Sequence, residues 1–390
     1  YYKDYKLDVG SITLRFPITD ETGNHGWWQR ILDEQGVLPK TTFKTGWKSQ
    51  GHSWLTPNTN YIESKEIWIT EGIFDTIALW LSGITSFSCL SAGHGYYPSI
   101  FLNHIKQKCA EHNPPLPLPK LVWAFDNDDA GHKGIFHNIE KAVADGFECE
   151  AALPPGGRKK QDWNDLYKQD RLKFSDLDTY KYYGALLIAE KPVDKAILIY
   201  KRNGTKTFPF DFNNQVFWFK LDNDKYDEYM KDINFEDKDK NEDWLEEEKE
   251  KAQAERREAA LQAAANVTKI INCKPTALYY QYSEETDEAW YYFNIDFPRS
   301  QKPVKNTFTG SQLAAASEFK KRLLAVAPGV VYTGSGNQLD RLLQDWIEDI
   351  KRVQLINYVG YHSDLKTYVL GELAYQNGKQ FKINNEDYFE

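Results

Sequence analysis

Residues 66–153 alternate short apolar runs with helix-length amphipathic stretches, and this alternation limits the possible folds more than any other feature of the chain. The pattern predicts strands at 67–70, 85–90, 121–125 and 147–153 and helices at 74–81, 99–109 and 130–144. Strands joined by helix-length crossovers form a parallel sheet that is covered by helices on both faces. We therefore expect an α/β domain here.

The rest of the chain has other patterns, and its 390 residues suffice for two or three domains. A hairpin over 12–32 makes the N-terminal part β-rich, and a segment near 250 rich in Glu, Lys, Ala and Gln predicts a charged helix. The expected divisions are a β-rich subdomain (1–65), the parallel-sheet domain (66–170), a β-rich segment (171–240), a charged helical linker (241–266) and an α+β accessory domain (267–390).

Within the second half, the apolar pattern predicts strands at 195–201, 216–221, 277–282 and 290–297 and helices at 312–327 and 338–351. A hairpin turn is expected at Asn377-Gly378. The Gly-rich run 333–337 lacks the lysine of a phosphate-binding loop, so it is expected to be a loop before a helix.

Acidic residues follow three of the four predicted parallel strands. Glu71 follows the first strand, Asp126 and Asp128 follow the third, and Asp162 follows the fourth, while Asp75 lies one helical turn after Glu71. Because ligands bind at the carboxyl ends of such strands, we expect these side chains to share one crevice. Carboxylates that converge repel each other unless a divalent cation lies among them, and Mg²⁺ or Mn²⁺ suits oxygen ligands.

Each of these acids also has a simpler interpretation. An Asp at a junction between strand and helix is often a helix N-cap, so Asp128 or Asp129 can cap the helix predicted at 130–144. Glu71 before Gly72 can be a polar turn residue. Helix capping, however, does not require acids after three different strands, so the combination favours a metal site.

Four segments carry a family resemblance. The sequences TEGIFD at 70–75 and FDNDDAGHK at 125–133 resemble the E-G and D-x-D motifs of the Toprim module, which is shared by bacterial-type primases, type IA and II topoisomerases and some nucleases. The segment QDWND at 161–165 is similar to the acidic segment that follows in primases. The hairpin with LRFPITD at 14–20 resembles the one that precedes the module in bacterial and phage primases.

The resemblance covers residues 10–168 and implies a Toprim fold: a parallel sheet flanked by helices, with the N-terminal β-rich subdomain in front of it. The chain departs from the family at Asn164, where cellular primases often have a second Asp, in the proline-rich loop 113–119 and in the loop 91–97. These departures favour primases of phages and mobile elements over the cellular enzyme.

The resemblance also implies roles for individual residues. Glu71, Asp126 and Asp128 would be catalytic, and Glu71, Asp75, Asp126, Asp128 and Asp162 would hold Mg²⁺ or Mn²⁺. Separately, the four cysteines stand far apart with no histidine at ligand spacing, so no zinc site is expected within this chain. Nucleotide and DNA phosphates would be met by basic residues on the hairpin, in the loop after it and near the acids: Arg15, Arg30, Lys44, Lys48, Lys133, Arg158, Lys159 and Lys160.

The implied activity is that of a DNA primase, a nucleotidyltransferase that joins nucleoside triphosphates into short RNA primers on single-stranded DNA during replication of a phage, plasmid or other mobile element. Two alternatives remain open. The same acids serve phosphodiester hydrolysis in Toprim nucleases, and a fold can persist as a catalytically silent nucleic-acid-binding module in a replication or defence complex.

The net charge of -9 argues at first against a phosphate partner. Residues 222–258, however, hold 16 acidic and 8 basic residues, so the excess acid belongs almost wholly to this one stretch, which runs into the predicted linker. No run is apolar enough for a membrane span, and the charged N-terminus is unlike a signal peptide, so a cytoplasmic protein of a prokaryotic or phage-infected cell is expected. The start at Tyr1 suggests a longer polypeptide, and a replicative helicase is the expected partner, possibly downstream in it.

Overall fold

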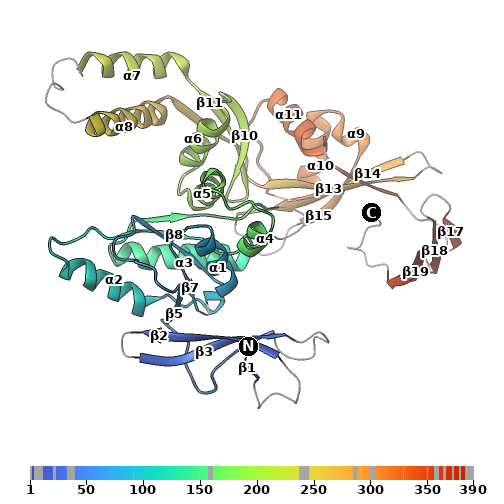
Figure 1. Cartoon of the computed structure of the whole chain (residues 1–390). Coiled ribbons are helices and arrows are strands. Elements are labelled where there is room, and N and C mark those ends of the chain that lie inside the picture. The colour runs from blue at the N-terminus through green and yellow to red at the C-terminus, as the bar shows by residue number, and fades with distance from the viewer. Residues whose placement is uncertain are drawn as a thin grey trace. The chain divides into compact units, whose positions relative to one another are not determined.

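The computed structural model divides the chain into two compact units, residues 1–190 and 191–390 (Figure 1). The residues that the structure describes are 2–3, 12–20, 23–32, 40–90, 92–156, 161–236, 246–283, 288–298, 304–327, 329–348, 350–354, 360–362, 366–370, 373–376 and 379–382.

A five-stranded sheet with the order β5-β7-β6-β8-β9 forms the centre of the first unit. Its parallel strands are those expected from the alternation: β6 (Glu66–Thr70), β7 (Ser86–Cys89), β8 (Lys120–Trp123) and β9 (Cys149–Ala151). The predicted α/β fold is therefore confirmed. The edge strand β5 (Ser53–Leu55) pairs antiparallel with β7, so a strand from the expected N-terminal segment belongs to the central sheet.

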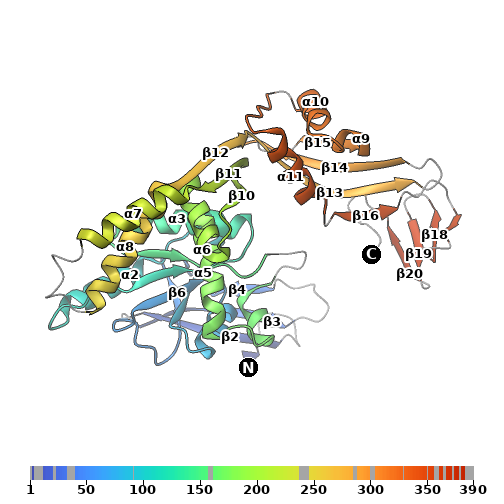
Figure 2. The same cartoon turned by 90° about the horizontal axis from the view of Figure 1, so that it is seen from above.

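Helices cover both faces of this sheet (Figure 2). Helices α2 (Ser99–Glu111) and α3 (Asp129–Ala144) pack on the face that carries Ile67 and Leu121. The face that carries Trp68 and Val122 is covered by α1 (Ile73–Leu81), α4 (Trp163–Lys168) and α5 (Phe174–Ile188). A short 3-10 turn, Ala92–His94, follows β7. The strands are buried on both sides, which explains their near-continuous apolar sequences.

An antiparallel sheet lies N-terminal to this domain. It contains β1 (Tyr2–Lys3), β2 (Ile12–Asp20), β3 (Gly23–Leu32) and β4 (Thr41–Phe43) in sequence order. Phe16 contacts Trp54 and Phe74 edge-to-face, each at 5.7 Å between ring centroids. The Phe16 face of the hairpin therefore packs against the first turn of α1.

The second unit begins with a three-stranded sheet, order β10-β11-β12, and three helices. The strands are β10 (Thr207–Phe212), β11 (Gln215–Leu221) and β12 (Ala265–Ile271), and the helices are α6 (Pro192–Asn203), α7 (Asn223–Glu236) and α8 (Glu246–Ala264). Helix α8 confirms the charged helix expected in the linker. It runs directly into β12.

The strand predicted at 195–201 is wrong, because this segment belongs to helix α6. Pro192 stands in the first turn, and Gly204 ends the helix in the left-handed conformation at φ 70°. Ala196 and Ile197 are buried against the β10-β11-β12 sheet. The few apolar residues of α6 are also compatible with a strand, because a short apolar run does not distinguish the two structures.

A second sheet in this unit has the order β15-β14-β13-β16 and is covered by helices on one face. Its strands are β13 (Lys274–Ser283), β14 (Glu288–Asp296), β15 (Val304–Thr309) and β16 (Lys351–Gln354), and its helices are α9 (Gly310–Leu313), α10 (Ala316–Val326) and α11 (Gly336–Ile347). The single helix predicted at 312–327 is therefore divided in two. Ser335 caps α11, as expected for the Gly-rich loop.

Four short strands complete the second unit as an antiparallel sheet: β17 (Gly360–His362), β18 (Thr367–Leu370), β19 (Leu373–Gln376) and β20 (Lys379–Lys382). The turn predicted at Asn377-Gly378 lies between β19 and β20, outside the described residues. Over the described part of the chain, no helix combines the length and the apolar character needed to cross a membrane.

Gly184 lets α5 approach β9 closely, and this packing gives a test of the fold. A Cβ atom at Gly184 would lie 2.0 Å from the backbone oxygen of Ala151, which cannot move without disturbing the sheet. We expect Gly184→Ala to lower the free energy of unfolding by roughly 2 kcal/mol or more, although alanine normally favours a helix. Denaturant unfolding measures this difference.

Gly336→Ala is the matched control, because Gly336 is also helical and a Cβ there would meet nothing within 4 Å. This substitution should leave stability unchanged or slightly raised. Equal stability of the Gly184→Ala and wild-type proteins would contradict the packing described for α5 and β9.

Candidate functional site

The five candidate acids lie where the parallel strands end. Glu71 follows β6, Asp75 is in the first turn of α1, and Asp126 lies in the loop after β8. Asp128 and Asp162 are the N-cap residues of α3 and α4. All five are partly buried. The structure thus places the acids of the three motifs at the carboxyl edge of the sheet.

Asp75 shows most clearly that these carboxylates are crowded. Burial, and next the negative charge of Asp162, raise the pKa of Asp75 to about 7, and Asp126 adds a smaller repulsion. A backbone hydrogen bond opposes this rise, because the Asn164 N–H donates to Asp75 Oδ1 at 3.2 Å. Repulsion from two acids that are distant in sequence indicates that Asp75, Asp126 and Asp162 share one site.

Asp128 and Asp162 are helix caps, as the simpler interpretation of these acids predicts for Asp128. Asp128 Oδ1 accepts a hydrogen bond from the Gly131 N–H at 2.9 Å, and Asp162 Oδ1 accepts one from the Asp165 N–H at 2.7 Å. A cap of this kind uses one carboxylate oxygen of two. Capping therefore fixes the direction of each side chain without excluding a second role for it.

Two glycines allow the site to be compact. A Cβ at Gly72 would lie 2.4 Å from Asp75 Oδ2, so any side chain there would displace the Asp75 carboxylate. A Cβ at Gly131 would lie 2.1 Å from the backbone oxygen of Asp126. Steric crowding thus explains why glycine occupies these positions in the E-G motif and in the segment after D-x-D.

Buried hydroxyl groups hold the loop that carries Glu71. Thr70 and Thr76 share a 2.6 Å hydrogen bond, and each hydroxyl also reaches the Gly72 carbonyl. The Ser88 hydroxyl, on β7, donates to the Glu71 carbonyl at 3.1 Å. All three hydroxyl residues are buried, and sequence reasoning missed them because isolated Thr and Ser residues in apolar runs have no distinctive pattern.

Asn127, the middle residue of D-x-D, connects two loops. Its amide nitrogen donates to the Pro154 carbonyl at 2.8 Å, and its amide oxygen lies 2.8 Å from His132 Nε2. The loop after β8 is therefore tied to the segment after β9 that leads to Asp162. The sequence gives no sign of this role.

Trp163 anchors the other side of the site. The ring is fully buried, its Nε1–H donates to the Ala124 carbonyl at 2.7 Å, and it meets Trp68 and Tyr180 edge-to-face. Ala124 is two residues before Asp126, so this hydrogen bond fixes the start of α4 beside the end of β8. Asp162 is positioned by the residue that follows it.

The donor set suits a hard divalent cation, since it consists of carboxylate oxygens and carries excess negative charge. Burial, and next the charges of Asp162 and Asp126, raise the pKa of Asp75, so a bound cation would favour its ionised form. Among the residues that the structure describes, however, no group of three acidic, histidine or cysteine side chains is arranged to hold a metal ion. The residues fit a metal in their chemistry and charge, and their side chains would have to converge to bind it.

The predicted phosphate-binding residues are dispersed. Lys44 and Lys48 are exposed in the loop after β4, and Lys133 is exposed near the start of α3. Arg30 pairs with Leu14 across the hairpin, on the face that carries Phe16. Arg158, Lys159 and Lys160 lie outside the described residues.

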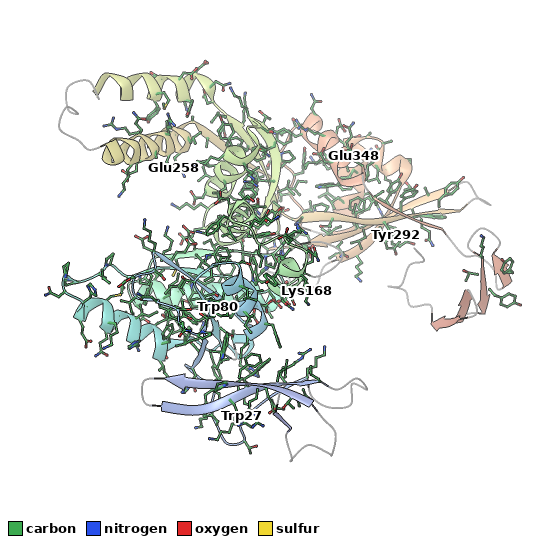
Figure 3. The ribbon with its side chains drawn as sticks, viewed as in Figure 1. Trp27, Trp80, Lys168, Glu258, Tyr292 and Glu348 are labelled. Atoms are coloured by element: carbon green, nitrogen blue, oxygen red, sulfur yellow. The ribbon has the colours of Figure 1, made fainter. Side chains whose placement is uncertain are left out.

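Arg15 lies on the opposite face of the hairpin and is part of a local network. Its guanidinium donates to Gln29 Oε1 at 3.0 and 3.2 Å and lies 4.2 Å from the ring centre of Trp27. Gln29 in turn donates to Thr42 Oγ1 at 3.0 Å. Figure 3 labels Trp27 in this sheet. A DNA role for Arg15 stays a prediction.

Comparison with solved structures finds similar chains, and three of them are described here. The RNA polymerase domain of Mycobacterium tuberculosis primase DnaG has a TM-score of 0.34 and 16% identity, covering 50% of this chain and 70% of that one. The same domain in complex with double-stranded DNA has a TM-score of 0.32 and 18% identity, covering 43% of this chain and 52% of that one. The primase fragment of the bacteriophage T7 primase-helicase protein has a TM-score of 0.29 and 19% identity, covering 44% of this chain and 63% of that one.

A comparison with curated proteins finds no match. A family model described as Toprim-like matches residues 68–167, which span β6 to α4 and contain all five candidate acids. The resemblance inferred from the E-G and D-x-D motifs is therefore confirmed for this part of the chain. Residues 68–167 form a Toprim-like domain.

Proposed function

We propose that this chain is a DNA primase that synthesises short RNA primers on a single-stranded DNA template, in the replication of a phage, plasmid or other mobile element. The observation that carries the proposal is the placement of five acids at the carboxyl edge of the parallel sheet, inside a Toprim-like domain. Charge concentrated in this way favours a divalent cation and hence phosphoryl transfer. The N-terminal hairpin, which packs against α1, supports primase over the nuclease alternative.

Mg²⁺ or Mn²⁺ would be held by Glu71, Asp75, Asp126, Asp128 and Asp162. When bound, the cation lowers the pKa of the attacking 3′-hydroxyl and neutralises charge on the α-phosphate and the leaving pyrophosphate. Single-stranded DNA and nucleoside triphosphates would be the substrates, and a replicative helicase would be the partner, in the same polypeptide or a separate one.

The chain's own residues would position the reactants. Ser88 fixes the Glu71 backbone, so that the Glu71 carboxylate can act as a general base or as a metal ligand. Lys133 lies near the N-terminus of α3, where backbone N–H groups also favour phosphate. We propose Arg30, Lys44 and Lys48 as further phosphate contacts, and the roles predicted for Arg15, Arg158, Lys159 and Lys160 belong to the same proposal.

Template-dependent incorporation of labelled ribonucleotides tests the activity. Glu71→Gln and Asp126→Asn remove one negative charge each with little change in shape, and each should lower primer synthesis by about 100-fold or more. Asp129→Asn is the matched control, because Asp129 is an exposed acid in the first turn of α3, next to Asp128. Its activity should stay close to that of the wild type.

The same assay separates the alternatives. Cleavage of the template without synthesis, lost in both variants, would identify a nuclease. DNA binding without either reaction, unchanged in Glu71→Gln and Asp126→Asn, would identify a silent module. Either result would overturn the proposal.

The raised pKa of Asp75 predicts how stability depends on pH in the absence of metal. Because the folded protein holds this proton up to about pH 7 and the unfolded chain releases it near 3.8, the contribution of Asp75 to stability falls as the pH rises between these values. We expect Asp75→Asn to be more stable than the wild type by roughly 2 kcal/mol at pH 8, with the difference vanishing near pH 4.

Denaturant unfolding at several pH values, with EDTA and with excess Mg²⁺, measures this effect. Mg²⁺ should stabilise the wild type more than Asp75→Asn, since binding requires the ionised carboxylate. A wild-type advantage over Asp75→Asn at pH 8 in EDTA would show that the repulsion at Asp75 is absent.

A further inference from the structure

His132, at the end of the first turn of α3, contacts the D-x-D loop (residues 126–128) in two ways. Its backbone N–H donates to the Asp128 carbonyl at 2.8 Å, which is an ordinary bond of the helix. Its ring nitrogen Nε2 lies 2.8 Å from Asn127 Oδ1. The residue is partly buried, and no step of the proposed reaction uses its ring.

The hydrogen bonds of Asn127 determine which atom donates in the contact with His132. The Pro154 carbonyl can only accept, so it must face the Asn127 amide nitrogen, which lies 2.8 Å away. The Asn127 oxygen is then the atom that faces His132, and because an amide oxygen only accepts, Nε2 must carry the hydrogen. His132 therefore donates to Asn127, and Asn127 donates to Pro154.

The loop has little space on either side of this connection. A Cβ at Gly156 would lie 3.3 Å from Asn127 Nδ2, which is tighter than most side chains permit. On the helix side, the Asp128 N–H donates to the Asp126 carbonyl at 3.0 Å, and a Cβ at Gly131 would lie 2.1 Å from the same oxygen. The D-x-D loop is thus held between α3 and the segment after β9, and the Asn127 side chain joins the two.

We propose that His132 is a positioning residue for the metal-binding acids. By holding the Asn127 amide, it fixes the backbone between Asp126 and Asp128, and it keeps the segment that leads to Asp162 beside them. The proposal rests on the proposed function, which supplies the metal, and His132 itself would touch neither metal nor substrate. Residues that orient metal ligands from outside the ligand set typically change metal affinity by about 10- to 100-fold when they are replaced.

Binding of Mn²⁺ to the full chain, followed by the electron paramagnetic resonance signal of free Mn²⁺, tests this role without any synthesis. His132→Leu removes the donor and should weaken Mn²⁺ binding by about 10- to 100-fold. His132→Gln should bind Mn²⁺ nearly as the wild type does, because the amide nitrogen of Gln offers a donor near the position of Nε2. His137→Leu is the matched control, since His137 is exposed on the same helix.

A double-mutant cycle with Asn127 separates positioning from general damage to the fold. Asn127→Ala should weaken Mn²⁺ binding as His132→Leu does, and combining the two should cost little more, because both act through one contact. In primer synthesis, His132→Leu should raise the KM for Mn²⁺ and leave kcat at saturating Mn²⁺ close to that of the wild type. Denaturant unfolding in EDTA should show that each variant is folded under the assay conditions.

Mn²⁺ binding by His132→Leu as tight as that of the wild type would overturn the role of His132. So would a His132→Gln protein that binds as weakly as His132→Leu, or losses of affinity that add up in the cycle. A wild type that binds Mn²⁺, with the expected losses in the variants, but makes no primer would support this role and overturn the proposed function. Absence of Mn²⁺ binding in the wild type would overturn both.

Discussion

The repulsion among carboxylates at the carboxyl edge of the parallel sheet is the constraint on which the first unit depends. Unlike an acid in a chance cluster on the surface, Asp75 is partly buried, so its charge is poorly solvated as well as repelled. Such an arrangement costs stability and persists only where the surrounding packing holds it in place. Gly72 and Gly131 show how tight this packing is, because each lacks the space for one more carbon atom.

Helix α4 both contributes to the repulsion at Asp75 and reduces its effect. It presents Asp162 to Asp75, which raises the pKa of Asp75, and it donates the Asn164 N–H to the same carboxylate, which lowers that pKa. The helix is only six residues long and is fixed by Trp163, whose ring is packed between Trp68 and Tyr180. The electrostatics of the edge therefore depend on aromatic packing within the α1, α4 and α5 layer.

The sequence predicted the parts of the site that follow from periodicity. The apolar runs located β6 and β8, and an acid directly after a parallel strand must lie at the carboxyl edge, so the places of Glu71 and Asp126 followed. The sequence did not predict the contacts between side chains far apart in the chain. The bond from Ser88 to Glu71 and that from Trp163 to Ala124 depend on how strands and helices pack.

Errors in the prediction arose where one pattern fits two structures. The apolar residues of 195–201 suited a strand, but Pro192 and Gly204 at the two ends favour a helix, and packing against β10–β12 stabilises it. Strand β5 was missed as a member of the central sheet because three residues are too short for periodicity to show. The aromatic strands of the second half were predicted, but only the pairing of the strands shows which side chains lie on the same face of the sheet. The pairing of Tyr279 with Tyr292 joins two strands, so it cannot be predicted from the sequence of either strand alone.

The net charge of the whole chain is a poor guide to what the chain binds, because the excess acids are concentrated in one stretch of the sequence. Residues 222–258 span α7 and most of α8, and α8 is 19 residues long, or roughly 28 Å from end to end. Its Glu-rich end is the one remote from β12, which continues through Cys273 into β13. At physiological ionic strength charges are screened over about 8 Å, so the acids at that end act only on groups close to them. Local charge and not the sum of -9 decides what the second unit can bind.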